Sequence, residues 1–155
     1  MTNITIHIDG GTGGSDKRAG AAAVARTADG QFAGWLSEHL PGMTNNEAEY
    51  HGLMLGLKVA SLLGLQRVQI VSDSEVVVRQ MQGRSRVMSA RLKLLHRDAC
   101  LAVRQFASVE FRHVPREQNR LADALAGEAV MGRTVQMDRE RRIVRRMFPR
   151  FSLVN

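Results

Sequence analysis

The first forty residues of this chain predict three consecutive β-strands, and this limits the folds that the rest of the sequence can complete. Isoleucine alternates with polar residues over 3–9, the period-two pattern of a strand. Residues 19–27 are small and apolar, a turn signal follows at 28–30, and residues 31–40 alternate again. Three such strands joined by short connections are expected to lie side by side and antiparallel.

Helices and strands alternate in the remainder of the chain. The spacing of apolar residues predicts strands and helices over these ranges: strands at 67–71 and 108–113, and helices at 44–63, 74–81, 89–106 and 118–131. This order describes an α/β fold with a five-stranded mixed sheet, in which the first strand is central and pairs in parallel with the fourth. The expected strand order is 3-2-1-4-5, with helices flanking both faces. Trp35 is expected in the core, and His7 and His96 are expected to be exposed.

Length and composition fit one domain followed by a tail. A chain of 155 residues, 44% of them hydrophobic, is long enough for a single core, which we expect within 1–131. The sequence shows neither an apolar run of membrane-spanning length nor the pattern of a signal peptide, and therefore predicts a cytoplasmic protein without a membrane segment. Its single cysteine, Cys100, excludes an internal disulfide and a cysteine-based metal site, and is expected to be buried.

Positive charge is concentrated in the segment 132–155. The net charge of the chain is +7, and this segment holds seven arginines against Asp138 and Glu140. We interpret it as an arginine-rich C-terminal extension with three open roles: an amphipathic helix from Asp138 that packs on the body, a free arm that binds nucleic acid, or a dimer contact. The protein is expected to be a monomer, with a dimer through this extension as the alternative.

Two of the predicted strands lead directly into an aspartate. Asp9 follows the first strand and Asp73 follows the fourth. Because ligands bind beyond the carboxyl ends of parallel strands, both carboxylates are expected at one crevice. Gly10 and Gly11 are interpreted as positions where a sugar-phosphate backbone comes close to the chain. Each aspartate also has a simpler interpretation, Asp9 as a turn former and Asp73 as a helix cap.

The helix that starts with TNNEAEY offers two candidates for a third carboxylate. Thr44 and Glu47 have the spacing of a capping box, which would occupy Glu47 at the helix start. Glu49 precedes Leu53 and Leu57 by one and two turns, so it lies beside the apolar stripe that packs on the sheet. We therefore select Glu49.

Asp123 is the fourth candidate, at the margin of the apolar face of the last helix, where aspartate is a poor helix former. Four carboxylates that converge without a cation repel one another and become protonated. Oxygen ligands favour hard ions, which predicts a site for two Mg²⁺ ions with Mn²⁺ as a substitute. Such a pair aligns an attacking water and stabilises the leaving oxygen of a phosphodiester.

Four motifs together resemble the type 1 ribonucleases H, the ribonuclease HI family. They are IDGGTGGS, TNNEAEYHGLMLGL, VSDSEVVV and HVPREQNRLADALA, in the family's order and spacing over most of 1–131. The chain looks like the short forms without a basic handle, the archaeal-like and reverse-transcriptase-like domains. The resemblance implies an endoribonuclease that hydrolyses the RNA strand of RNA/DNA hybrids by a two-metal-ion mechanism and leaves 5′-phosphate and 3′-hydroxyl ends.

The resemblance also implies roles for individual residues. The family's metal ligands match the four carboxylates Asp9, Glu49, Asp73 and Asp123. Positions that touch the minor groove of the hybrid and contact ribose 2′-hydroxyls match Gly11, Asn45 and Asn46. Gly10 and Asn119 are further candidates for substrate binding.

Two features depart from the better-known bacterial members. A histidine that assists product release there has its spacing at His113, but FRHVPR is typical of a strand end, where Arg116 is better placed to meet a phosphate. We favour Arg116 and keep His113 as the alternative. Residues 81–89 lack the basic handle, so affinity for the hybrid is expected from Arg84, Arg86 and the C-terminal extension.

Two other functions stay open at this point, because a fold does not fix a function. The same architecture serves nucleases of other specificity. A non-catalytic module that binds RNA or a hybrid through its arginine-rich extension is the second alternative.

Overall fold

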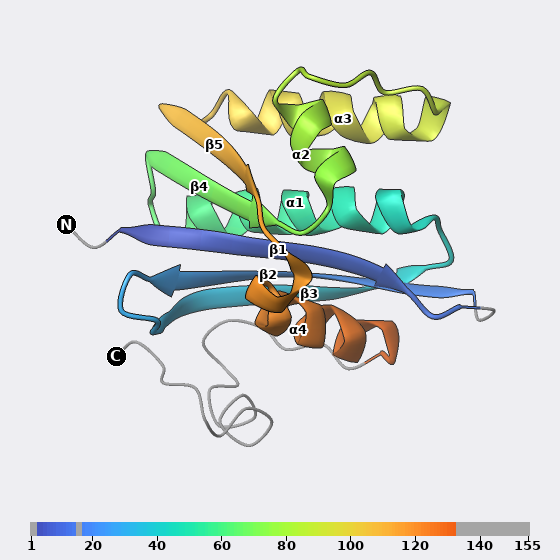
Figure 1. Ribbon diagram of the computed structural model, residues 1–155, viewed down its shortest axis with the longest axis horizontal. Helices are drawn as coiled ribbons and strands as arrows, with labels where there is room; N and C mark the ends of the chain where they lie inside the picture. The colour runs from blue at the N-terminus through green and yellow to red at the C-terminus, as the bar shows by residue number, and fades with distance from the viewer. Residues whose placement is uncertain (1–2, 15–16, 133–155) are drawn as a thin grey trace.

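A five-stranded mixed sheet organises the part of the chain that the computed structural model describes, residues 3–14 and 17–132 (Figure 1). Its strands are β1 (Ile4–Thr12), β2 (Arg18–Thr27), β3 (Phe32–Pro41), β4 (Arg67–Ser72) and β5 (Ser108–His113). The order is β3-β2-β1-β4-β5, with β1 antiparallel to β2 and parallel to β4. The predicted fold class and strand order are confirmed. The C-terminal extension beyond Gly132 lies outside the described residues.

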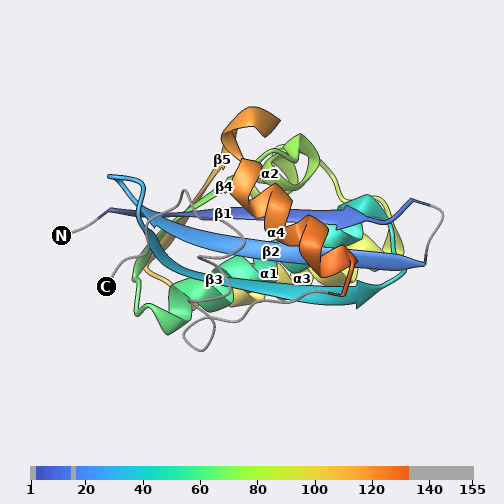
Figure 2. The same cartoon turned by 90° about the horizontal axis from the view of Figure 1, so that it is seen from below.

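Helices cover both faces of the sheet, as predicted (Figures 1 and 2). They are α1 (Asn45–Leu62), α2 (Glu75–Met81), α3 (Ala90–Val103), the 3-10 turn η1 (Arg116–Gln118) and α4 (Arg120–Val130). On one face, α1 packs on the sheet and α3 packs on α1, whereas α4 lies on the opposite face. The last helix begins two residues later than predicted, because η1 precedes it.

Strand β2 shows how the two cores are built. Its small side chains alternate, so that Ala23 and Ala25 belong to the core under α1, whereas Ala22 and Val24 pack with α4. Trp35 lies in this second core with 4% of its surface exposed, as expected. A strand of small residues allows a helix to sit close on either face.

The exposure of two residues on α3 differs from the prediction. His96 is half-buried, with Nε2 3.2 Å from the carbonyl oxygen of Gln80, so the prediction that it is exposed is wrong. Cys100 is half-buried rather than buried, and its thiol lies 3.6 Å from His96 Nε2.

Glycines bring α1 unusually close to β1. A Cβ on Gly10 would lie 2.2 Å from the carbonyl carbon of Ala48, and a Cβ on Gly56 would lie 2.7 Å from Ile8 Cγ2. Only hydrogen fits at these positions, because real Cβ atoms do not approach other atoms so closely. The helix that carries Glu49 is thereby held against the strand that carries Asp9.

Strand β1 does not stop at Asp9 but continues to Thr12. Its parallel pairing with β4 ends at Ile8 and Ser72, whereas its antiparallel pairing with β2 runs on to Thr12 and Ala19. The glycines therefore extend the strand instead of breaking it. Beyond Ile8 the edge of β1 on the β4 side is no longer paired with a strand. A crevice lined by Asp9, Gly10 and Gly11 opens at this point. Among the described residues, no helix has both the length and the hydropathy needed to span a bilayer.

Candidate active site

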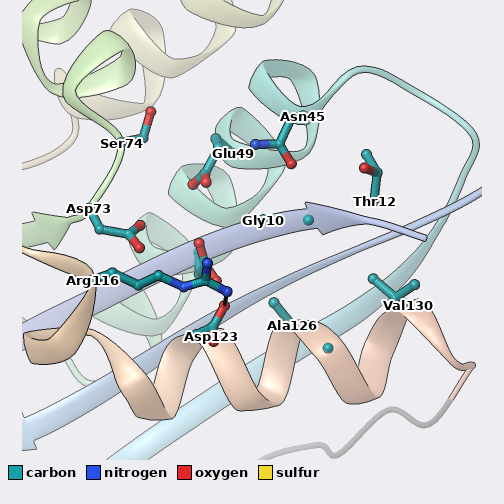
Figure 3. A pocket seen from close by; sticks show the side chains of 13 residues that line it. Gly10, Thr12, Asn45, Glu49, Asp73, Ser74, Arg116, Asp123, Ala126 and Val130 are labelled. Carbon is teal, nitrogen blue, oxygen red and sulfur yellow. Dashed lines mark hydrogen bonds and ion pairs between the residues drawn. The ribbon is translucent and has the colours of Figure 1, made fainter. Parts of the chain in front are cut away.

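Three carboxylates from distant parts of the chain meet where β1 and β4 part. Asp9 comes from β1, Glu49 from α1 and Asp73 from the segment after β4, and their ligand oxygens all lie within 4.8 Å of one another. Figure 3 shows Glu49 and Asp73 directed into the same space beside β1. The structure thus brings together three of the four predicted carboxylates in one tight cluster.

Local capping explains why these side chains are available. Ser74, not Asp73, caps α2, because its hydroxyl accepts a hydrogen bond from the N–H of Val77 at 3.3 Å. Thr44 caps α1 in the same way by accepting from the N–H of Glu47 at 3.2 Å. Asp73 is therefore not used as a helix cap, and Glu49 lies one turn inside α1 on its buried side.

Asp123 lies at the rim of the same crevice, outside the tight cluster. It is on the first turn of α4, its side chain is 42% exposed, and one carboxylate oxygen lies 3.5 Å from an Nη atom of Arg116. Arg116 and Asp123 both line the crevice with the other three acids. Figure 3 shows the guanidinium of Arg116 next to the carboxylate of Asp123.

Burial and mutual repulsion perturb two of the acids strongly. Burial, together with the neighbouring carboxyl groups of Asp73 and Asp123, raises the pKa of Asp9 to about 8. Burial, with the charges of Asp9 and Asp73, raises the pKa of Glu49 to about 10. Oxygen Oε2 of Glu49 is buried and has no hydrogen-bond partner among the described residues. A buried carboxylate oxygen beside two like charges fits a hard divalent cation, the ligand chemistry of Mg²⁺ or Mn²⁺.

His113 and Arg116 are placed differently at this site. His113, at the end of β5, donates from Nε2 to the backbone carbonyl of Asp73 at 3.2 Å. Arg116 reaches over the crevice from η1 with 75% of its side chain exposed. His113 therefore contacts the backbone that carries a metal-ligand candidate, whereas Arg116 presents its charge to solvent inside the crevice.

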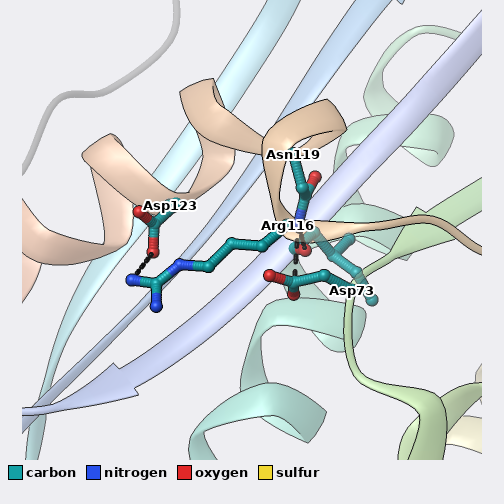
Figure 4. A network of polar contacts seen from close by, with 5 residues as sticks. Asp73, Arg116, Asn119 and Asp123 are labelled. Carbon is teal, nitrogen blue, oxygen red and sulfur yellow. Dashed lines mark hydrogen bonds and ion pairs between the residues drawn. The ribbon is translucent and has the colours of Figure 1, made fainter.

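Asn119 is oriented into the protein rather than toward the solvent. It is 1% exposed, and its amide nitrogen donates to the carbonyl of Ile8 at 2.9 Å and to a carboxylate oxygen of Asp73 at 3.4 Å (Figure 4). A side chain used in this way has little free surface to offer a bound substrate. The expected substrate contact of Asn119 stays a prediction, and its observed contacts are with the carbonyl of Ile8 and the carboxylate of Asp73.

The remaining substrate-binding candidates divide into two groups. Those that line the crevice are Gly10, Gly11 and Asn45. Those that are not among its lining residues are Asn46, Arg84 and Arg86, the last two in the exposed connection between α2 and α3. The missing side chain of Gly10 faces α1, whereas a Cβ on Gly11 would meet nothing within 4 Å.

Sequence reasoning missed several residues of the crevice and the burial of His7. Thr12, Ser74, Ala126, Gly127 and Val130 also line the crevice. His7 was expected to be exposed, and that prediction is wrong: it is half-buried on the α4 face of β1, with Nδ1 3.3 Å from Oδ1 of Asn119. Burial lowers its pKa below the usual range. The alternation of β1 gave the only signal, because it places residue 7 on the same face as Asp9.

The mixed sheet of order 3-2-1-4-5, with acids grouped where the two central parallel strands part, defines a ribonuclease H fold. The sequence matches the reverse transcriptase-like family over residues 7–129. The chain belongs to this family, as one of its ribonuclease H domains.

Two curated relatives show how the chain compares in sequence. It is 39% identical over 128 residues to the bifunctional protein Rv2228c of Mycobacterium tuberculosis. The aligned stretch covers 82% of this chain and 35% of that protein. It is 30% identical over 127 residues to ribonuclease HI of Halobacterium salinarum, which covers 82% of this chain and 64% of that protein. The chain thus spans about a third of the mycobacterial relative.

Two solved ribonuclease H structures are also similar to this chain. The N-terminal ribonuclease H domain of Rv2228c from M. tuberculosis is similar with a TM-score of 0.79 and 36% identity, over 85% of this chain and 96% of that one. LC11-RNase H1, solved in complex with an RNA/DNA hybrid, is similar with a TM-score of 0.78 and 32% identity, over 84% of this chain and 98% of that one.

Proposed function

We propose that this protein is an endoribonuclease that hydrolyses the RNA strand of RNA/DNA hybrids and leaves 5′-phosphate and 3′-hydroxyl ends. The observation that carries the proposal is the grouping of Asp9, Glu49 and Asp73 within 4.8 Å at the base of an open crevice. The substrate class is supported by LC11-RNase H1, which was solved with an RNA/DNA hybrid bound.

The four carboxylates would hold two divalent cations, Mg²⁺ in the first place and Mn²⁺ as a substitute. Asp9, Glu49 and Asp73 fit this role by their grouping, and Asp123 fits it by its position at the rim of the same crevice. Such ions, when bound, lower the pKa of an attacking water and stabilise the departing 3′-oxygen of the scissile phosphodiester. A cation bound by these acids would also give a partner to Oε2 of Glu49, which is buried and has no hydrogen-bond partner among the described residues.

The chain's own residues position the hybrid at the acids. Arg116, exposed and paired only loosely with Asp123, is free to turn its guanidinium to a phosphate oxygen next to the scissile bond. Gly11 leaves space for a sugar-phosphate backbone along β1, and Asn45 at the start of α1 is placed to contact a ribose hydroxyl. His113 is the alternative to Arg116, at the backbone of Asp73.

Affinity for the hybrid is expected to come from outside this crevice as well. Arg84 and Arg86 are exposed between α2 and α3, and the seven arginines after Gly132 carry most of the net positive charge. Contacts of this kind are independent of sequence and weaken with salt, since each neutralised phosphate releases counterions.

A comparison of substrates tests the proposal. RNA/DNA, RNA/RNA and DNA/DNA duplexes of one sequence, labelled at either end, are incubated with the full chain in Mg²⁺ and in EDTA. We expect cleavage of the RNA strand of the hybrid alone, dependent on Mg²⁺, with 3′-hydroxyl ends that a polymerase extends. Equal cleavage of the other duplexes would establish a nuclease of different specificity. Binding of the hybrid without cleavage would establish a binding module.

A further inference from the structure

We infer that His7 is a positioning residue of the active site: it fixes the orientation of the Asn119 amide, and through that amide the carboxylate of Asp73. This inference rests on the proposed function, because it assigns His7 to the metal-ligand set that the function requires. The path runs from the α4 face of β1, through Asn119 at the start of α4, to Asp73 after β4.

Asn119 connects elements that are far apart in the sequence. Its amide nitrogen lies 2.9 Å from the carbonyl oxygen of Ile8 and 3.4 Å from a carboxylate oxygen of Asp73 (Figure 4). Its amide oxygen lies 3.3 Å from Nδ1 of His7. With 1% of its surface exposed, Asn119 meets little solvent, so its amide depends on these protein partners.

The direction of each hydrogen bond follows from the one partner that can act only as an acceptor, the carbonyl of Ile8. The backbone carbonyl of Ile8 only accepts, so the amide nitrogen of Asn119 must face it. The amide oxygen then faces His7, which must donate from Nδ1, and the second amide hydrogen is left for Asp73. A rotation of the amide by half a turn would place its oxygen against both the Ile8 carbonyl and the Asp73 carboxylate. His7 stabilises the productive orientation because its Nδ1–H group needs an acceptor, and the reversed amide would present its NH₂ group there instead.

A small cavity on the α4 face of β1 decides the choice of variant. The cavity measures about 220 Å³ and is lined by His7, Arg26, Glu117, Asn119 and Arg120, among others. Removal of the imidazole by alanine would enlarge a polar space, and a water could then donate to Asn119 in its place. Leucine fills the space and supplies no donor. Asparagine supplies an amide N–H close to the position of Nδ1 and is the conservative rescue.

Groups that orient metal ligands from behind affect metal affinity and turnover by about 10 to 100-fold when they are removed. His7 acts one step further away than Asn119, so we expect an effect at the lower end of that range, about tenfold. The effect should appear in kcat and in the affinity for the cation. KM for the hybrid should stay near the wild-type value, since His7 is not among the residues that line the crevice.

The experiment compares His7→Leu and His7→Asn with the wild type in the full chain, with His39→Leu as the matched control. His39 also bonds α4 through Nδ1, to the carbonyl of Ala129 at 2.8 Å, and it does not line the crevice. Binding of Mn²⁺ alone is measured by calorimetry, kcat and KM with a labelled hybrid, and the melting temperature in EDTA. We expect weaker Mn²⁺ binding and lower kcat in His7→Leu, recovery in His7→Asn, and wild-type metal binding in His39→Leu.

Wild-type Mn²⁺ affinity and kcat in His7→Leu would overturn the inference. An equal loss of Mn²⁺ affinity and kcat in both His7 variants, or a loss that His39→Leu shares, would also overturn it. If His7→Leu does not fold, a loss of metal affinity in the folded His7→Asn would do the same. A nitrogen-15 spectrum of the wild type adds a measurement that needs no variant, since His7 should carry its hydrogen on Nδ1 and the reverse tautomer would contradict the assignment. Failure of the proposed function is distinguishable, because it is measured on the wild type alone, as no cleavage of the hybrid or equal cleavage of the other duplexes. The role of His7 is measured instead as the difference in Mn²⁺ affinity and kcat between the wild type and its variants.

Discussion

Gly52 of α1 lies directly against the backbone of Asp9, such that a Cβ on Gly52 would come within 2.4 Å of the Asp9 carbonyl oxygen. Glu49 is on the same helix, one turn earlier. The absence of a side chain at position 52 therefore sets how near the carboxylates of Glu49 and Asp9 can come. Close backbone packing, rather than any direct attraction between the two acids, brings them together.

Substitution of Gly52 by alanine tests this relationship. The added methyl group meets backbone, which cannot turn away, so α1 must move, and overpacking of this kind costs about 1–3 kcal/mol. We expect a lower melting temperature and a lower kcat. Gly127→Ala is the control for stability alone, because a Cβ on Gly127 meets nothing within 4 Å although Gly127 lines the crevice, and alanine should stabilise α4 by up to about 1 kcal/mol. Wild-type stability of Gly52→Ala would contradict the packing described here.

Replacement of Asp9 by asparagine should abolish cleavage and leave the fold and hybrid binding nearly intact. The change removes a charge from the centre of the acidic cluster but keeps the shape of the side chain. Cleavage of a labelled hybrid, circular dichroism and a filter-binding measurement check the three parts of the prediction. Turnover at the wild-type rate would remove Asp9 from the catalytic residues.

The acidic cluster should make stability fall with rising pH when divalent cations are absent. Burial raises the pKa of Asp9 from 3.8 to about 8 and that of Glu49 from 4.5 to about 10, so the folded state binds more protons than the unfolded state between these values. Stability is therefore greatest below the unfolded pKa and is lost as the pH rises through the folded one, by up to about 1.4 kcal/mol per pH unit for each carboxyl.

Urea unfolding in EDTA between mildly acidic and mildly alkaline pH measures this effect. Asp9→Asn should lose part of the pH dependence and be more stable than the wild type at alkaline pH, since it has no carboxyl to deprotonate at that position. Addition of Mg²⁺ to the wild type should reverse the loss. A stability that rises with pH in EDTA would show that the cluster is not under repulsion.

Much of the fold and half of the site follow from local pattern. Strand order was predictable because three strands precede the first helix, and Asp9 and Asp73 were predictable because each comes after a run of apolar positions with strand periodicity. Glu49 could be preferred over Glu47 because helical spacing places it beside the buried stripe. These inferences need only the periodicity of one element at a time.

The features that were missed depend on contacts between distant residues. His7 and Asn119 are 112 residues apart, and nothing in either local pattern predicts that they share a hydrogen bond. The continuation of β1 to Thr12 depends on its pairing with β2, while glycines by themselves are typical of a turn. Asp123 was predicted as a metal ligand from its place at the margin of the apolar face of its helix, and only the structure shows that it lies at the rim of the crevice, 3.5 Å from Arg116.

Arg116 and His113 can be separated by the form of their effect. Arg116→Gln should raise KM and reduce the slope of log affinity against log salt by about one, because a phosphate contact is lost. His113→Gln keeps a donor for the Asp73 carbonyl and should leave the salt slope unchanged. Hybrid binding over a range of salt concentrations, with cleavage measured in parallel, distinguishes the two. An unchanged slope in Arg116→Gln would favour His113 as the assisting residue.

Removal of residues 133–155 should raise KM and leave kcat at saturating hybrid unchanged. The extension, residues 132–155, supplies seven arginines that are expected to add phosphate contacts to those made in the crevice. Each phosphate contact that is lost should lower the salt slope by about 0.7–0.9.

A variant of full length with all seven arginines changed to glutamine separates the effect of charge from that of packing. If the extension is an arm that binds nucleic acid, both variants should weaken hybrid binding equally. A packed helix or a dimer contact requires the truncated chain alone to lose thermal stability or change its mass in solution. Loss of all cleavage at saturating hybrid in both variants would instead show that the extension contributes to the reaction itself.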